Sequence, residues 1–203
     1  MSRPILQWGV ATLTLPGEKE SGDRHLVLPY ENGALVAAVD GLGHGEEAAA
    51  AAELAVALLE KGRHHPLQVL LDRCHEQLKQ TRGVVMSLAA FNLLEGTMSW
   101  VGVGDVLGVL VRAQPEVAPV VKNLVTQGGV VGIRLPPTNP EVLPVKRGDR
   151  LIFATDGVHQ GFDADVSREE EPQQTADRIL SRYKKNTDDA LVLVVRYDGG
   201  DAA

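Results

Sequence analysis

The feature that most constrains this chain is an apolar run that ends on an aspartate and passes through glycines into an alanine-rich segment. Residues 34–39 are apolar, Asp40 follows them, and glycines occupy positions 41, 43 and 45. The pattern predicts a strand over 34–39, a tight turn, and a helix over 46–60. Gly41 would let its own carbonyl approach whatever Asp40 holds, and carboxylate and carbonyl oxygens suit a hard cation. An Asp-Gly pair alone is equally consistent with an ordinary turn.

Acidic residues recur at the ends of three further predicted strands. Asp156 directly follows Thr155 at the end of an apolar run, and Asp188 comes just before another. Asp23 lies just ahead of a third. Four acidic sites far apart in the sequence could therefore converge on one edge of a sheet. The carboxylates of such a cluster would repel one another, and their pKa values would shift. Bound divalent cations usually offset this repulsion.

The composition narrows the class of function. The net charge of -7 gives no support to nucleic-acid binding, and an acidic protein that acts on phosphate needs metal ions to invert the local charge. Cys74 is the only cysteine and His64 has no partner at ligand spacing, so neither disulfides nor a zinc site are expected. A single cysteine fits a cytoplasmic location. The N-terminus has no long apolar run, so neither a signal peptide nor a membrane span is expected.

Periodicity predicts one domain that mixes strands and helices. At 203 residues the chain is expected to form a single domain over 1–203. Antiparallel strands with helices segregated in pairs suit a layered α+β domain. Strands are predicted over 5–15, 26–30, 34–39, 84–94, 97–103, 106–112, 150–154 and 190–197, with shorter strands after 112, and helices over 46–60, 66–80 and 173–184.

The acidic motifs follow one another in an order that can be compared with known families. They are Gly22-Asp23, Asp40-Gly41-Leu42-Gly43-His44-Gly45, Gly104-Asp105, Gly148-Asp149, Thr155-Asp156-Gly157 and Asp188-Asp189. In this order they resemble the metal-dependent serine/threonine protein phosphatases of the protein phosphatase 2C type. The Asp-Gly-x-Gly-His-Gly motif is similar to the hallmark of the bacterial sporulation and stress branch. The resemblance spans roughly 23–196 and implies a four-layer α-β-β-α sandwich that forms one phosphatase catalytic domain.

The resemblance also implies roles for the acids. Asp40 would bridge two manganese or magnesium ions, while Asp156 and Asp188 would complete one ion site. The Gly41 carbonyl would serve the other site, with Asp23 a nearby or water-mediated ligand. The two ions would activate a water that attacks the phosphorus of phosphoserine or phosphothreonine. Asp40, Asp156 and Asp188 are thus the expected catalytic residues.

Several positions keep alternatives open. Asp23 is either a ligand or a residue of an exposed turn, and Asp105 either a turn residue or a support for the ligands. Asp189 is expected to tighten its turn. His44 would cap the helix or pack, although a direct catalytic role stays open. No third metal ion is expected, because residues 158–161 lack the further acid that relatives often carry.

The substrate is implied by the same resemblance. It points to phosphorylated scaffold proteins of the stressosome, a cytoplasmic signalling assembly. With a net charge of -7, binding energy would come from surface contacts with a folded partner. Residues 157–172 are the expected contact loop, outside the core. The alternatives are a small-molecule phosphomonoesterase that uses the same metals, and an inactive phosphatase-like module that binds partners.

Overall fold

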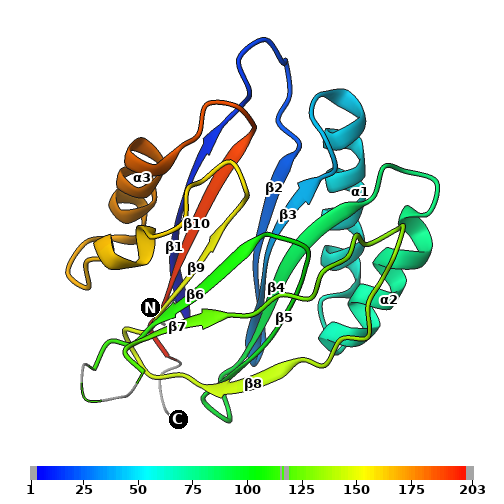
Figure 1. The fold of residues 1–203 in the computed structure, drawn as a ribbon. Helices are drawn as coiled ribbons and strands as arrows, with labels where there is room; N and C mark the ends of the chain where they lie inside the picture. Colours follow the sequence, from blue (N-terminus) through cyan, green and yellow to red (C-terminus); the bar gives the residue numbers. More distant parts are fainter. Residues whose placement is uncertain (1–3, 115, 117–118, 200–203) are drawn as a thin grey trace.

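Two antiparallel sheets lie face to face between helices in this computed structural model (Figure 1). The structure describes residues 4–114, 116 and 119–199. The expected absence of a signal peptide therefore falls partly on positions outside the described residues. In the described part of the chain, no helix could span a lipid bilayer. The α+β class and the α-β-β-α layering are as predicted.

Each sheet has five strands, and each combines distant parts of the chain. The first sheet has the order β1 (Leu6–Leu13), β10 (Ala190–Tyr197), β9 (Arg150–Ala154), β6 (Leu107–Val111) and β7 (Val121–Leu124). The second has the order β2 (Asp23–Tyr30), β3 (Gly33–Gly41), β4 (Val84–Asn92), β5 (Thr97–Val103) and β8 (Glu141–Pro144).

The central strands are buried on both faces. In β10, Leu191 and Leu193 point into the core between the sheets, whereas Val192 and Val194 pack toward the outer helix. Successive side chains of a strand point to opposite faces, so a strand covered on both sides must be apolar throughout. This requirement explains the unbroken apolar run that made the strand predictable.

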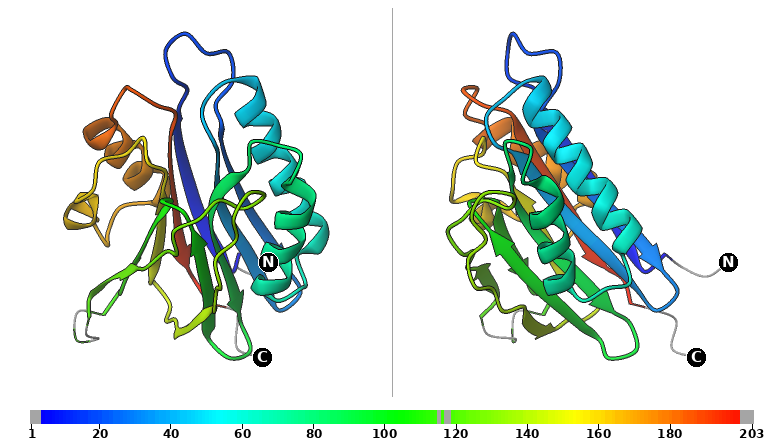
Figure 2. Two further views of the ribbon diagram at one scale, coloured as in Figure 1. Left: turned by 45° about the vertical axis from the view of Figure 1, so that its right-hand side comes forward. Right: turned by 90° about the vertical axis from the view of Figure 1, so that its right-hand side faces the viewer.

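The helices cover the outer faces unequally (Figure 2). Helices α1 (Glu46–Gly62) and α2 (Leu67–Leu78) pack on the second sheet around a core that includes Leu59 and Leu71. On the first sheet there is one α-helix, α3 (Pro172–Tyr183), with the short 3₁₀ helix η1 (Phe162–Asp165). The prediction of paired helices thus holds for only one of the two outer layers.

Two further expectations are corrected. Strand β2 begins at Asp23, not at residue 26, because Asp23 pairs with Asp40 of β3. The expectation that 157–172 lies outside the core is wrong for Val158 and Phe162, which are buried against the α3 side of the first sheet.

Candidate active site

Four aspartates from distant parts of the chain line one pocket, which we call the acid-lined pocket. Asp40 lies near the end of β3, Asp105 lies between β5 and β6, Asp156 follows β9, and Asp188 precedes β10. The pocket has a volume of ≈ 410 Å³. The structure thus brings together the three expected catalytic residues, and it adds Asp105. Its other lining residues are Leu42, Gly43, Val85, Gly104, Gly128, Gly129 and Val130.

Asp23 is next to this pocket but is not among its lining residues. It is the direct partner of Asp40 in the β2–β3 register, and it is 4% exposed. Its Oδ2 accepts a 2.8 Å hydrogen bond from the Thr155 hydroxyl, which in turn accepts one from the Leu191 N–H. The exposed-turn alternative for Asp23 is therefore wrong.

Asp189 connects backbone segments next to the acid-lined pocket through hydrogen bonds. Its two carboxylate oxygens accept hydrogen bonds from the backbone N–H groups of Leu15, at 2.8 Å, and Gly22, at 2.6 Å. Its own N–H donates to Asp188 Oδ1 at 2.9 Å. Asp189, which directly precedes β10, therefore ties together the segment after β1 and the residue before Asp23. This is a longer-range role than the turn-tightening expected from sequence.

The glycine after each of two pocket aspartates is required by close packing. A Cβ on Gly41 would lie 2.1 Å from the Ala48 carbonyl oxygen, and one on Gly157 would lie 1.9 Å from that of Asp189. Both clashes are with backbone, which cannot swing aside as a side chain can. The glycines thus let α1 and the start of β10 approach the acid-lined pocket. Gly41 is not among the residues that line the acid-lined pocket. The role of its carbonyl as a metal ligand therefore stays a prediction.

The clustered acids disturb one another's ionisation. Burial first, and then the charges of Asp23 and other nearby aspartates, raise the pKa of Asp40 to about 9. Burial raises the pKa of Asp23 to about 7, against the opposing effect of the Thr155 hydrogen bond. Burial and the charge of Asp188 also raise the pKa of Asp156. The cluster at neutral pH therefore needs either protons or cations to balance it.

The donor chemistry fits hard cations that keep part of their water. Within the described residues, no three histidine, cysteine or acidic side chains lie close enough together to hold one ion directly. The charged side chains of the acid-lined pocket are all carboxylates, the ligands that magnesium and manganese prefer. Magnesium usually keeps several waters and binds proteins through one or two carboxylates. Spaced carboxylates fit such a hydrated ion, and they do not fit a closed cage.

His44 faces a different hollow from the acid-lined pocket. Its Nδ1 lies 2.6 Å from Glu18 Oε1, and the hollow that it lines is formed with residues 17–20, 45–47 and Arg82. The predicted capping role is wrong, because Gly45 is the N-cap of α1 and no side chain bonds to the cap.

Sequence reasoning placed Thr155 in a motif but gave this residue no role of its own. This residue is fully buried and links Asp23 to β10 through its hydroxyl. The available signal was its place directly before Asp156-Gly157, where a hydroxyl follows the apolar residues 151–154 at the end of β9. Asp105 was left open by the sequence, and the structure places it in the wall of the acid-lined pocket.

The fold with its flanking helices is that of the protein phosphatase 2C class. The family described as Stage II sporulation protein E (SpoIIE) matches residues 31–198, so the chain belongs to the SpoIIE family of serine/threonine phosphatase domains. A comparison with curated protein sequences finds no match.

Solved structures support the same class. A structure from the bacterial stressosome, described as a modular system adapted to control secondary messenger signaling, is 27% identical, with a TM-score of 0.86 over 94% of this chain and 99% of that chain. RsbX in complex with magnesium is 18% identical, with a TM-score of 0.84 over 97% and 98%. The phosphatase domain of SpoIIE from Bacillus subtilis is 21% identical, with a TM-score of 0.76 over 98% and 65%. The last two likenesses concern the fold alone.

Proposed function

We propose that this chain is an active, metal-dependent protein serine/threonine phosphatase, with residues 1–203 forming one catalytic domain. The observation that carries the proposal is the convergence of Asp40, Asp156 and Asp188 on one pocket, with Asp23 paired behind Asp40. A cluster of carboxylates with raised pKa values is costly unless cations bind there.

In this proposal, the acids would hold two manganese or magnesium ions, and each acid would have a different place among the ligands. Asp40 would be the shared ligand. Asp156 and Asp188 would complete one ion site, while the Gly41 carbonyl and Asp23 would serve the other. When bound, the ions would lower the pKa of an attacking water and offset the charge that builds on the phosphoryl oxygens.

The phosphoryl group would depend on this arrangement because the pocket offers it no cationic side chain. None of the described lining residues is a lysine or an arginine. An oxyanion would otherwise meet only carboxylates, whose repulsion would exclude it. Substrate binding and metal binding are therefore expected to be linked.

For the substrate, we propose phosphoserine or phosphothreonine on scaffold proteins of a stressosome-type assembly. The support is the 27% identity over nearly the full length to a structure from the bacterial stressosome. The net charge of -7 also favours a partner that binds through surface contacts over one that is drawn in by its phosphate.

The test is release of phosphate by the purified chain with and without manganese. Phosphoserine peptides and an intact phosphorylated scaffold protein are compared with free phosphoserine and an aryl phosphate. We expect manganese-dependent release, with a much higher kcat/KM on the folded protein. Equal efficiency on free phosphoserine would favour the small-molecule phosphomonoesterase, and no turnover of any substrate would favour the inactive binding module.

A further inference from the structure

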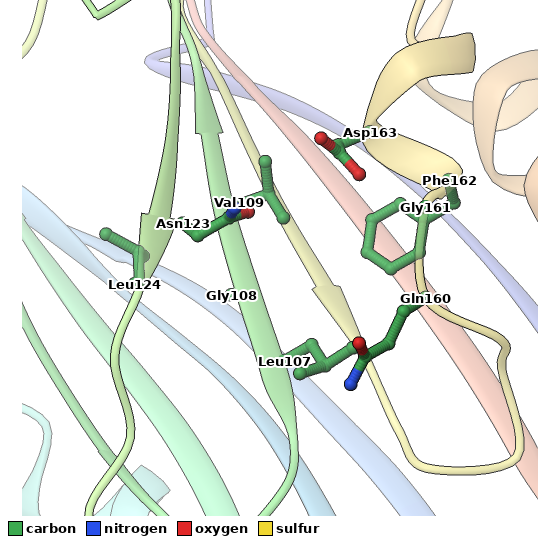
Figure 3. Close-up of a pocket in the computed structure, with 9 residues that line it drawn as sticks. All are labelled: Leu107, Gly108, Val109, Asn123, Leu124, Gln160, Gly161, Phe162 and Asp163. Atoms are coloured by element: carbon green, nitrogen blue, oxygen red, sulfur yellow. The ribbon is translucent and has the colours of Figure 1, made fainter.

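A second pocket lies on the outer face of the first sheet, beside η1 and away from the cover of α3 (Figure 3). We call it the flanking pocket. It has a volume of ≈ 360 Å³. It is lined by Leu107, Gly108 and Val109 of β6, Asn123 and Leu124 of β7, and Gln160, Gly161, Phe162 and Asp163. It lies in the outer layer that, among the described residues, holds one α-helix, α3, whereas the other outer layer holds α1 and α2.

The flanking pocket is close to the acid-lined pocket along both of its walls. Leu107 follows Asp105 by two residues, and Gln160 follows Asp156 by four. Because an extended chain spans at most about 3.6 Å per residue, the Cα atoms of Leu107 and Asp105 are within about 7 Å. Two residues of an extended substrate cover the same distance.

The lining of the flanking pocket combines apolar side chains with a carboxylate that forms no hydrogen bond or ion pair with the described residues. Val109 and Phe162 are buried core residues whose side chains border the pocket, and Leu107 is partly buried. The Asp163 carboxylate has no hydrogen-bond or ion-pair partner among the described residues, whereas Asp165, two positions on, pairs with Arg182 at 2.9 Å. Figure 3 shows the Asp163 carboxylate on the Val109 side of η1.

The negative charge of this lining favours a cationic occupant. Among the described residues, Asp163 is the only charged one that lines it, and none of the lining residues is a lysine or an arginine. A long cationic side chain suits such a place, because its methylene stem can pack on apolar surface while its charged end reaches a carboxylate. An acidic side chain would meet repulsion from Asp163 and from the neighbouring acid-lined pocket.

We propose that the flanking pocket binds a lysine or arginine of the substrate, two or three residues from the phosphorylated serine or threonine. The stem packs on Leu107, Val109 and Phe162, and the cation pairs with Asp163. This inference rests on the proposed phosphatase function and adds a sequence preference to it. It makes Asp163 a specificity-determining residue with no part in the phosphoryl chemistry.

The test uses phosphoserine peptides that differ at one position at a time, two or three residues on either side of the phosphoserine. Each position carries arginine, leucine or glutamate, and kcat/KM is measured with saturating manganese. At one position we expect arginine to exceed leucine about fivefold, the upper range for an exposed ion pair, and glutamate to be poorest.

Variants of Asp163 identify the group responsible. Asp163→Asn should abolish the advantage of arginine, and Asp163→Lys should make glutamate the best residue at the same position. Glu169→Gln and Glu169→Lys are the matched controls, since Glu169 is an exposed acid of the same segment that does not line the pocket. All four variants should hydrolyse an aryl phosphate at the wild-type rate.

The outcomes separate this inference from the function on which it rests. Turnover of every peptide with no preference at any position would overturn the flanking-pocket assignment and leave the phosphatase standing. A preference for leucine, or one for arginine that survives Asp163→Asn, would also overturn it. No turnover of any peptide or of the aryl phosphate would overturn both.

Discussion

Asp23 and Asp40 are directly paired across β2 and β3, so that two carboxyl groups occupy the same end of the second sheet. Like charges in directly opposite positions destabilise an antiparallel pair. Asp23 is buried and Asp40 is partly buried, which adds to this cost, and the desolvation of Asp40 raises its pKa to about 9. The pair therefore lowers the stability of the metal-free fold, and a bound cation would restore that stability.

Replacing the shared acid should separate activity from stability. Asp40→Asn should lower kcat/KM by at least about 100-fold, the scale seen when a preorganised electrostatic group is lost. In the presence of a chelator the same variant should melt higher than wild type, because a partly buried carboxylate that repels its neighbours is gone. Phosphate release and thermal melting measure the two effects. Asp177→Asn, at an exposed acid of α3, should change neither. Wild-type activity in Asp40→Asn would remove Asp40 from the proposed mechanism.

The metal-free protein should lose stability as pH rises. The pKa of Asp40 is raised from 3.8 to about 9 and that of Asp23 from 3.8 to about 7. Between these limits the folded state keeps protons that the unfolded state has released. The free energy of unfolding must therefore fall as pH increases from about 4 to about 9.

Urea unfolding at pH 5, 7 and 9 with a chelator measures this slope. The difference between wild type and Asp40→Asn isolates the contribution of Asp40, and saturating manganese should flatten it. If wild type gained stability relative to Asp40→Asn as pH rose, the assigned direction of the pKa shift would be wrong.

The two adjacent acids before β10 should behave differently. Asp188→Ala should be as damaging to activity as Asp156→Ala, because both residues line the acid-lined pocket. Asp189→Ala should be milder in activity and costly in stability. It leaves the N–H groups of Leu15 and Gly22 without their acceptor, and the loss is roughly 1–3 kcal/mol for the buried Gly22 group and smaller for the partly buried Leu15 group.

Turnover per folded molecule and chemical denaturation distinguish the two effects. Asp189→Asn, which keeps one acceptor oxygen, should recover part of the stability. A greater loss of turnover in Asp189→Ala than in Asp188→Ala would shift the proposed ligand by one position.

His44→Ala should keep substantial turnover. The imidazole is 2.6 Å from Glu18 and lines a different hollow from the acid-lined pocket. With metal-activated water, no protein base is obligatory. Steady-state kinetics with saturating manganese measure the effect, and Glu18→Ala is the matched variant for loss of the contact alone. A fall of several orders of magnitude with metals still bound would make His44 a required proton donor.

The sequence predicted those parts of the fold that depend on local pattern. The strands β3 and β10 were visible as unbroken apolar runs, because both of their faces are buried, and α1 was visible as an alanine-rich segment that follows glycines. The start of β2 at Asp23 was not visible, because it is set by pairing with β3. The long-range hydrogen bonds of Asp189 and Thr155 depend on contacts between distant segments, which a single sequence does not reveal. Helix α3 was predicted over 173–184, but the flanking pocket was hidden, because it forms between segments that are distant in the sequence.

The most direct test of the central claim is phosphate release from a phosphoserine peptide by metal-stripped protein, titrated with manganese. The account predicts negligible release without metal, a rise to full activity as manganese is added, and loss again with chelator. The metal-stripped protein should stay folded throughout, as circular dichroism would report. Asp40→Asn should stay inactive at every manganese concentration. Full activity after exhaustive metal removal would contradict the account.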